Sequence, residues 1–249
     1  MPEQNAEIIC PAKGITVRHA IDNMGWADLG GATLVIDALE KPEEWNAVDN
    51  AIKETTPDQP VKWLVNTHLH PDHTALNSRF EKEYGAAIVN SQTRKIEADG
   101  LRLSGTRRHC EIYCAPPCHT RNDWVVWLPA DKVLFVGDLF CWGLIPYIGR
   151  MNDKAQKQLS GVYQMLRKFP ADTVVPGHGP VCSSSELARF DEYSQRLFKD
   201  IKNALQNDVS PHKVKEDFAE PPADMLNWWR FTDWKHAANV DNIIRAFAV

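Results

Sequence analysis

The segment 67–73, Thr-His-Leu-His-Pro-Asp-His, is the feature that most constrains how this chain can fold. It gathers three imidazoles and a carboxylate within six positions, directly after the apolar run 61–65. Such a run, followed by a proline-bearing loop, is typical of a buried strand that ends at a sheet edge. We therefore expect a fold in which metal-ligating side chains converge at the end of a strand.

The spacing within this segment predicts two adjacent metal positions. His68 and His70 are two residues apart, so on an extended segment both side chains point to the same face and can bind one ion. Pro71 turns the chain, which lets Asp72 and His73 face a second position nearby. The alternative, a polar loop with incidental histidines, suits an isolated His-x-His better than a cluster this dense.

Three further candidate ligands follow downstream, each beside a predicted strand end. His119 lies in a proline-held loop ahead of the apolar run 124–128. Asp138 follows the apolar run 133–136, and His178 lies in Pro-Gly-His-Gly after another short strand. A lone histidine in a turn is more often structural, but three such residues after so dense a first cluster favour metal binding.

Four motifs now resemble a known family, the metallo-β-lactamase-fold hydrolase superfamily, over roughly residues 14–182. They are Thr-His-Leu-His-Pro-Asp-His, Cys-His-Thr, Gly-Asp-Leu and Pro-Gly-His-Gly, in that order. The resemblance implies an α/β fold, a four-layer αββα sandwich with a two-metal centre at one edge. It also implies a ligand set, in which His68, His70 and His119 hold the first metal, Asp72, His73 and His178 hold the second, and Asp138 bridges them.

The activity implied by the resemblance is that of a dinuclear zinc hydrolase. A metal-bridging hydroxide would cleave an ester, lactone, thioester or related bond of a small molecule, because zinc lowers the pKa of bound water from about 15.7 toward neutrality. Two Zn²⁺ per chain are expected, since mixed His and Asp ligands suit zinc better than calcium or magnesium, with iron or manganese as alternatives. Asp72 is the expected catalytic residue, because it could also orient the water or shuttle a proton.

Some positions depart from the family's patterns. Asp138 stands where true β-lactamases have Cys or Ser, so the chain resembles the bridged-metal hydrolases and antibiotic hydrolysis is not expected. The usual Gly-Gly after the first motif is replaced at 74–77, and Asn122 replaces the glycine of His-Thr-x-Gly, which prevents assignment to lactonases or glyoxalase II. Asp37 is followed by Ala-Leu rather than x-Gly, and we interpret it as a structural turn carboxylate.

Two other classes of protein stay open. A mono-iron persulfide dioxygenase would share many of these motifs, and a binding protein that has lost catalysis would bind metal weakly. His109 is interpreted as a polar strand residue first and an active-site residue second. Cys110, Cys114 and Cys118 indicate a structural zinc site only weakly, because Pro116 and Pro117 break any helix that would align them.

The window 138–151 is apolar yet loop-like, and it directly follows a candidate ligand. Loops on a rigid scaffold commonly line substrate pockets. The candidate substrate-binding residues are Trp142, Leu144, Ile145 and Tyr147. The alternative is that these four side chains only pack in the core.

The remaining pattern predicts one domain over 1–249, with a core of about 14–182 and a helical C-terminal extension of about 183–249. Segment 99–108 is polar and contains glycine, which predicts a surface loop. The Trp-rich extension would pack over the fold, roof the pocket or form a homodimer contact. Apolar positions such as Val240 and Ile244 recur in it at helical spacing.

Composition narrows the partners and the location. With 249 residues, 43% hydrophobic and 24% charged, one large core is feasible. The net charge of −5 and the lack of a basic run predict no nucleic-acid partner. Segment 1–7 lacks the pattern of a leader, no run approaches the ~20 apolar residues of a membrane span, and six cysteines form no evident disulfide framework. We expect a cytoplasmic protein that acts on a small molecule without a membrane partner.

Overall fold

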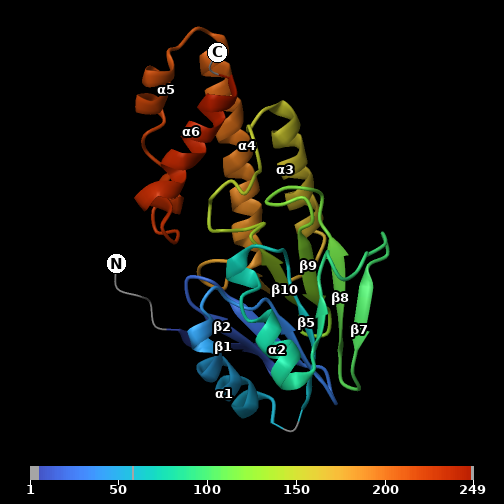
Figure 1. Cartoon of the computed structure of the whole chain (residues 1–249). Helices are drawn as coiled ribbons and strands as arrows, with labels where there is room; N and C mark the ends of the chain where they lie inside the picture. Colours follow the sequence, from blue (N-terminus) through green and yellow to red (C-terminus); the bar gives the residue numbers. More distant parts are fainter. Residues whose placement is uncertain (1–5, 58, 248–249) are drawn as a thin grey trace.

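The computed structural model describes residues 6–57 and 59–247 and has two β-sheets packed face to face, with helices on both outer sides (Figure 1). One sheet has six strands in the order β1-β2-β3-β4-β5-β6, and the other has five in the order β11-β10-β9-β8-β7. This architecture confirms the predicted α/β fold, a four-layer αββα sandwich. The expectation that the chain has no leader was made for segment 1–7, and residues 1–5 of that segment lie outside the described residues.

The elements have the following bounds. The strands are β1 (Glu7–Ala12), β2 (Ile15–His19), β3 (Met24–Asp28), β4 (Thr33–Ile36), β5 (Val61–Val65), β6 (Ala87–Val89), β7 (Leu101–Ser104), β8 (His109–Cys114), β9 (Trp124–Leu128), β10 (Val133–Gly137) and β11 (Thr173–Pro176). The helices are α1 (Trp45–Thr55), α2 (Asn77–Tyr84), α3 (Asp153–Leu166), α4 (Ser184–Gln206), α5 (Pro211–Asp217) and α6 (His236–Phe247). Short helical turns are η1 (Pro42–Glu44), η2 (Pro71–His73), η3 (Ala223–Met225) and the π-helical η4 (Phe231–Lys235).

Successive side chains of a strand point to opposite faces, and here both faces are apolar. In β4, Leu34 and Ile36 belong to the core between the sheets, whereas Val35 packs with residues of α1 and α2. In β10, Phe135 faces the same inter-sheet core and Leu134 faces α3 and α4. Each sheet is thus buried on both sides, which places three apolar layers through the molecule.

Parallel strand pairs bring several loops to one edge. β4 pairs in parallel with β5, and β10 pairs in parallel with β11. Because parallel strands end at the same side of a sheet, the segments after β4 and β5 meet, as do those after β10 and β11. Six of the seven candidate ligands follow three of these four strands, and His119 lies in the loop before β9.

The C-terminal extension is helical, as predicted. α4 begins with a capping box, in which Ser183 and Glu186 each satisfy the other's backbone N–H, and this accounts for its sharp start. Its buried face packs against α3 and α6. In Figure 1 the orange and red helices α4 to α6 lie beside α3, and α5 and α6 form the upper part of the molecule in this view.

One local expectation was wrong. Segment 99–108 is not only a loop, because it contains β7, an edge strand that pairs antiparallel with β8. Flanking Gly100 and Gly105 obscured the short alternation Leu-Arg-Leu-Ser.

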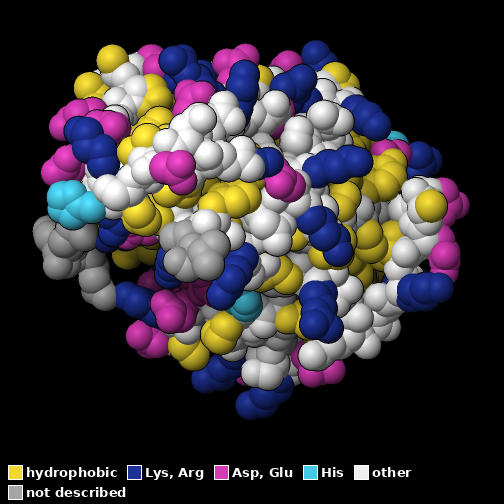
Figure 2. Space-filling model, turned by 90° about the horizontal axis from the view of Figure 1, so that it is seen from above, with side chains coloured by type: hydrophobic (Ala, Val, Ile, Leu, Met, Phe, Trp, Pro, Cys, Tyr) yellow, Lys and Arg dark blue, Asp and Glu magenta, His cyan; other side chains and the backbone are white. Residues whose placement is uncertain are grey.

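Figure 2 looks onto the end of the molecule from which the C-terminal helices rise. On this face Lys and Arg side chains are interspersed with acidic, apolar and uncharged ones. None of the helices in the described part of the chain combines the length and the apolarity that crossing a bilayer requires.

Candidate metal centre

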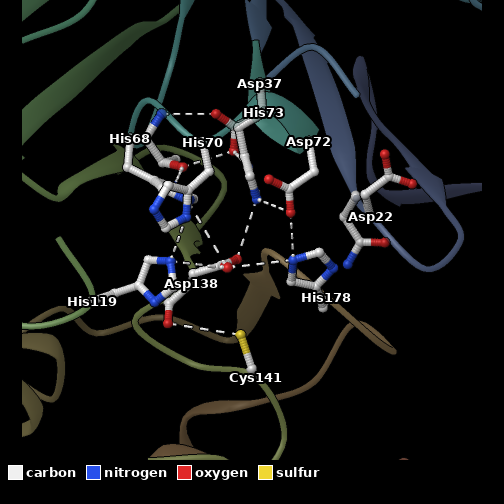
Figure 3. Close-up of polar contacts among 12 residues, drawn as sticks. Asp22, Asp37, His68, His70, Asp72, His73, His119, Asp138, Cys141 and His178 are labelled. Carbon is white, nitrogen blue, oxygen red and sulfur yellow. Dashed lines mark hydrogen bonds and ion pairs between the residues drawn. The ribbon is translucent and has the colours of Figure 1, made fainter. Parts of the chain in front are cut away.

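The seven predicted ligands meet at the sheet edge where the loops converge (Figure 3). His68 and His70 follow β5, whereas Asp72 and His73 lie in η2, the turn begun by Pro71. The other three come from the second half of the chain, His119 from the loop before β9, Asp138 from the end of β10 and His178 from the end of β11. Segments far apart in the sequence therefore supply one site.

The ligand atoms form two groups that share one carboxylate. The first group is His68, His70, His119 and Asp138, and the second is Asp72, His73, Asp138 and His178. Within each group one ligand atom per residue lies within 4.8 Å of all the others. Asp138 Oδ2 lies 3.3 Å from Nε2 of both His119 and His178. Asp138 is thus placed to touch ions in both positions.

Three buried ligand atoms lack any hydrogen-bond partner, namely His68 Nε2, His73 Nε2 and Asp138 Oδ1. His73 Nε2 and Asp138 Oδ1 are 3.2 Å apart, yet their geometry is not that of a hydrogen bond. A buried polar atom without a partner costs free energy, and such atoms normally have one. Convergent imidazole nitrogens and a shared carboxylate fit divalent cations, so these residues suit the metal centre that the sequence predicts.

The other ring nitrogens of three histidines have oxygen partners. His73 Nδ1 donates to Asp37 Oδ2 at 2.9 Å, and His178 Nδ1 donates to the carbonyl of Ile21 at 2.8 Å. His68 Nδ1 lies 3.2 Å from Thr67 Oγ1. Partners of this kind fix the ring orientation and leave Nε2 free for a metal.

From the sequence, Asp37 was interpreted only as a structural turn carboxylate. In the structure it also contacts residues of the His-rich segment. Besides His73 it accepts hydrogen bonds from the backbone N–H and the hydroxyl of Thr67, at 2.7 and 2.8 Å. Its backbone has a φ of 60°, an uncommon value for a residue other than glycine. A signal was present in the sequence, because Asp37 directly follows the strand 33–36, which pairs with the strand before the His-rich segment.

The loop that carries His178 is held from two sides. Asn23 Nδ2 donates to the carbonyls of Pro176 and Gly179 at 2.9 and 2.7 Å. Gly177 lies against Asp138, since a Cβ at position 177 would come within 1.9 Å of Asp138 Oδ1. Only glycine allows the His178 loop to approach the shared carboxylate so closely.

Burial and charge set the protonation states of the metal-free site. Burial lowers the pKa of His68 to about 2, so its imidazole is neutral and can act as a ligand. For His178, burial opposes protonation, but hydrogen bonds with Asp138 and Asp72 raise its pKa to about 10. Burial opposes ionisation of Asp72, yet the hydrogen bond from His178 and the charge of His73 lower its pKa to about 2. In the metal-free protein, the protonated imidazole of His178 thus supplies the positive charge beside the carboxylates of Asp72 and Asp138.

The four predicted substrate-binding residues lie in or against the core. Ile145 is buried there, Trp142 and Tyr147 pack against it, and Leu144 is half-buried. These contacts correspond to the packing alternative, and the substrate role stays a prediction. The cavity that touches Asp72 and His178 has a volume of about 120 Å³. Its other lining residues lie between positions 18 and 44, and none comes from the window 138–151.

The remaining candidates lie outside the two groups. His109 is half-buried, with Nε2 3.2 Å from Glu111 Oε1, and belongs to neither group of ligands. Cys110 and Cys118 are buried in different core layers and Cys114 is exposed, so these three thiols do not converge.

The chain matches the family described as the metallo-beta-lactamase superfamily over residues 22–109 and 108–178, a span that includes all seven ligands. Hydroxyacylglutathione hydrolase of Rhizobium meliloti is 27% identical over 169 residues, 64% of this chain and 62% of that protein. Metallo-beta-lactamase type 2 of Pseudomonas aeruginosa is 25% identical over 153 residues, 57% of this chain and 62% of that protein. The chain thus spans about three fifths of the length of these relatives.

Solved structures share the fold. The metallo-beta-lactamase from Pontibacter korlensis has a TM-score of 0.62 and 21% identity, over 76% of this chain and 98% of that one. The stereoselective inverting sec-alkylsulfatase from Pseudomonas sp. has a TM-score of 0.75 and 15% identity, over 98% of this chain and 50% of that one. The second likeness extends over the C-terminal helices as well as the sandwich.

Proposed function

The chain belongs to the metallo-beta-lactamase superfamily, and from this premise we propose that it is a hydrolase whose seven clustered ligands hold two zinc ions. The observation that carries the proposal is the pair of four-residue groups sharing Asp138, with three ligand atoms left without a partner. An apolar or fully hydrogen-bonded site would not leave such atoms buried.

The division of ligands follows the two groups. His68, His70 and His119 would hold one ion, Asp72, His73 and His178 the other, and Asp138 would contact both. When bound, zinc supplies Lewis acidity and a water of lowered pKa as the nucleophile.

Asp72 is the proposed catalytic residue among these ligands. Its Oδ2 lies 3.0 Å from His178 Nε2, and its carboxylate lines the 120 Å³ cavity. A carboxylate that reaches the cavity can orient the attacking water there.

The proposed substrates are small molecules with an ester, lactone or thioester bond. A cavity of about 120 Å³ accommodates one group of a substrate rather than a whole molecule, because ligand sites typically measure ~300–1,000 Å³. Relatives that bear the name hydroxyacylglutathione hydrolase support cleavage at an acyl carbon. We also propose a cytoplasmic location, which the six free cysteines support.

The test combines elemental analysis with a panel of substrates. Protein purified without added metal should contain about two zinc ions per chain and should cleave at least one member of a panel of ester, lactone, thioester, phosphodiester and sulfate-ester substrates. The variant Asp138→Ala should lose metal and more than about 100-fold in turnover, because even residues that only orient a ligand are worth 10–100-fold.

The opposite results have a clear meaning. About one iron per chain, without hydrolysis of any panel member, would overturn the proposal in favour of a persulfide dioxygenase. Unchanged metal content and turnover in Asp138→Ala would refute the shared-ligand assignment.

A further inference from the structure

The turn that follows Asp138 has an unusual backbone. Trp142 has a φ of 48° and Gly143 a φ of 88°, so two successive residues adopt left-handed conformations. For a tryptophan this conformation is strained, and it persists only where the surroundings impose it. The turn starts at Asp138, the ligand shared by the two groups. The contacts that hold the turn therefore bear on the metal centre itself.

The first contact comes from Lys235, in the C-terminal extension. Its side chain is only 1% exposed, and its Nζ donates to the carbonyl of Cys141 at 2.5 Å and contacts that of Trp142 at 3.4 Å. The same Nζ lies 4.2 Å from the centre of the Trp229 ring. Among the described residues the charges of Asp138 and Asp233 act on this amino group without an ion pair to either.

A buried amino group with this environment is costly, so packing alone does not explain it. A methionine or leucine would fill the same space without the cost of desolvating a charge. Burial lowers the pKa of Lys235 to about 8. Two carbonyl oxygens and an indole face compensate the charge in part.

Asn239 continues the same contact one helical turn later. Its Nδ2 donates to the carbonyl of Gly143 at 2.6 Å, and its Oδ1 accepts the N–H of Ile145 at 2.8 Å. Residues four apart on a helix lie on one face, so Lys235 and Asn239 act on neighbouring backbone groups. Together they take up three consecutive carbonyls of the turn.

The same turn is joined to the loop of His178. Trp142 Nε1 donates to the carbonyl of Pro180 at 2.7 Å. Gly179 lies between two indoles, because a Cβ there would come within 2.7 Å of Trp142 and 2.6 Å of Trp229. The turn after Asp138 and the loop of His178 are therefore packed as one unit under the extension.

We propose that Lys235 is a positioning residue for the metal centre, whose buried amino group fixes the turn after Asp138 and, through Trp142, the loop of His178. This inference rests on the metal site of the proposed function. It gives the extension a role beyond packing, since the extension sets the distance between two ligands that both belong to the second group.

The test compares Lys235→Met, which keeps the apolar stem and removes the donor, with Lys215→Met as a matched control. Lys215 is an exposed lysine of the same extension, whose Nζ pairs with Asp241 at 2.6 Å. For each variant, zinc affinity is measured by competition with a chelator, and the visible spectrum of the cobalt-substituted protein is recorded. Thermal unfolding of the metal-free protein reports the fold, and kcat and KM are measured on any substrate found.

Lys235→Met should lose about 10–100-fold in zinc affinity and should change the cobalt spectrum, because the ligand atoms move. Its kcat should fall more than its KM rises, and Lys215→Met should match the wild type. A Lys235→Met protein that unfolds like the wild type, and has wild-type zinc affinity and cobalt spectrum, would overturn the proposal.

A second variant decides the matter if Lys235→Met does not fold. Asn239→Asp keeps the acceptor for Ile145 and removes the donor to Gly143, so zinc affinity should fall in the same direction, and unchanged affinity would count against the proposal.

Measurements of metal affinity and of the cobalt spectrum need no substrate. Wild-type protein that binds cobalt but hydrolyses no panel member would thus refute the hydrolase proposal alone.

Discussion

Single histidines in this chain differ sharply in what their imidazoles contact. Nε2 of His119 lies 2.9 Å from His70 Nδ1 and 3.3 Å from Asp138 Oδ2, within the first group of ligands. His109 is also half-buried and also faces a carboxylate, but that carboxylate belongs to Glu111 on the strand β8. A comparison of His119 with His109 therefore distinguishes a metal-ligand position from an ordinary polar contact.

We expect His119→Ala to lose about one of two bound zinc ions and more than about 100-fold in turnover. His109→Ala should retain both ions and most of the activity, since it loses only a contact at the surface. Metal analysis and initial rates check both variants. A loss in His109→Ala as severe as in His119→Ala would mean that the third histidine of the first site was assigned wrongly.

The raised pKa of His178 predicts a pH dependence for the metal-free protein. The folded protein binds this proton up to about pH 10, whereas an unfolded histidine releases it near its ordinary pKa of 6.5. The folded state therefore holds more protons in this window, and the free energy of unfolding falls as pH rises. The contribution is fully present below pH 6.5 and is lost as the pH approaches 10.

Urea unfolding of chelator-treated protein at pH 6, 8 and 10 measures this effect. The stability difference between the wild type and His178→Gln should shrink as the pH rises. Zinc should weaken the dependence, because a ligating imidazole is neutral. A difference that stays constant over this range would contradict the ion pairs of His178 with Asp72 and Asp138.

At the scale of elements, the approach of the strands β10 and β11 decides the geometry of the site. The N–H of Gly177 donates to the carbonyl of Gly137 at 2.8 Å, so the loops after the two strands are joined directly beside Asp138. The structure leaves no room for a side chain at position 177.

Gly177→Ala should therefore displace Asp138 and lower zinc affinity by at least about 10-fold, as for a disturbed ligand orientation. Gly161→Ala is the matched control, because a Cβ at position 161 in the helix α3 meets open space. Alanine is the better helix former, so this variant should gain about 0.5–1 kcal/mol in stability and keep its metal affinity. Equal zinc affinity in the two variants would show that the contact at Gly177 does not position Asp138.

At the scale of the whole molecule, the metal centre joins both sheets, since its ligands follow β5 of one sheet and β8, β10 and β11 of the other. Zinc that binds only the folded chain should stabilise it by about 2.7 kcal/mol at a free concentration of 100 Kd. Thermal unfolding with zinc and with a chelator measures this shift. An identical midpoint in both conditions would exclude tight metal binding by the folded chain.

The two solved structures cover different shares of this chain. The β-lactamase fold of Pontibacter korlensis covers 76% of the chain, whereas the alkylsulfatase fold covers 98%. The C-terminal helices pack on the sandwich through α4 and reach the turn after Asp138 through Lys235 and Asn239.

The sequence by itself determined the family, the layered sandwich and the seven residues that the structure brings together. His68, His70, Asp72 and His73 could be grouped because their spacing within one loop already limits their separation. His119, Asp138 and His178 could be added because each lies beside an apolar strand. Local patterns of this kind are visible without knowledge of the tertiary fold.

Only the tertiary structure decided which groups support those ligands. Asp37 reaches His73 through the parallel register of β4 and β5, and Lys235 reaches the turn after Asp138 across more than ninety positions of sequence. The lining of the cavity beside Asp72 likewise comes from residues 18–44 rather than from the predicted window 138–151. Such contacts depend on how distant segments pair and pack, and that arrangement leaves no local periodicity in the chain.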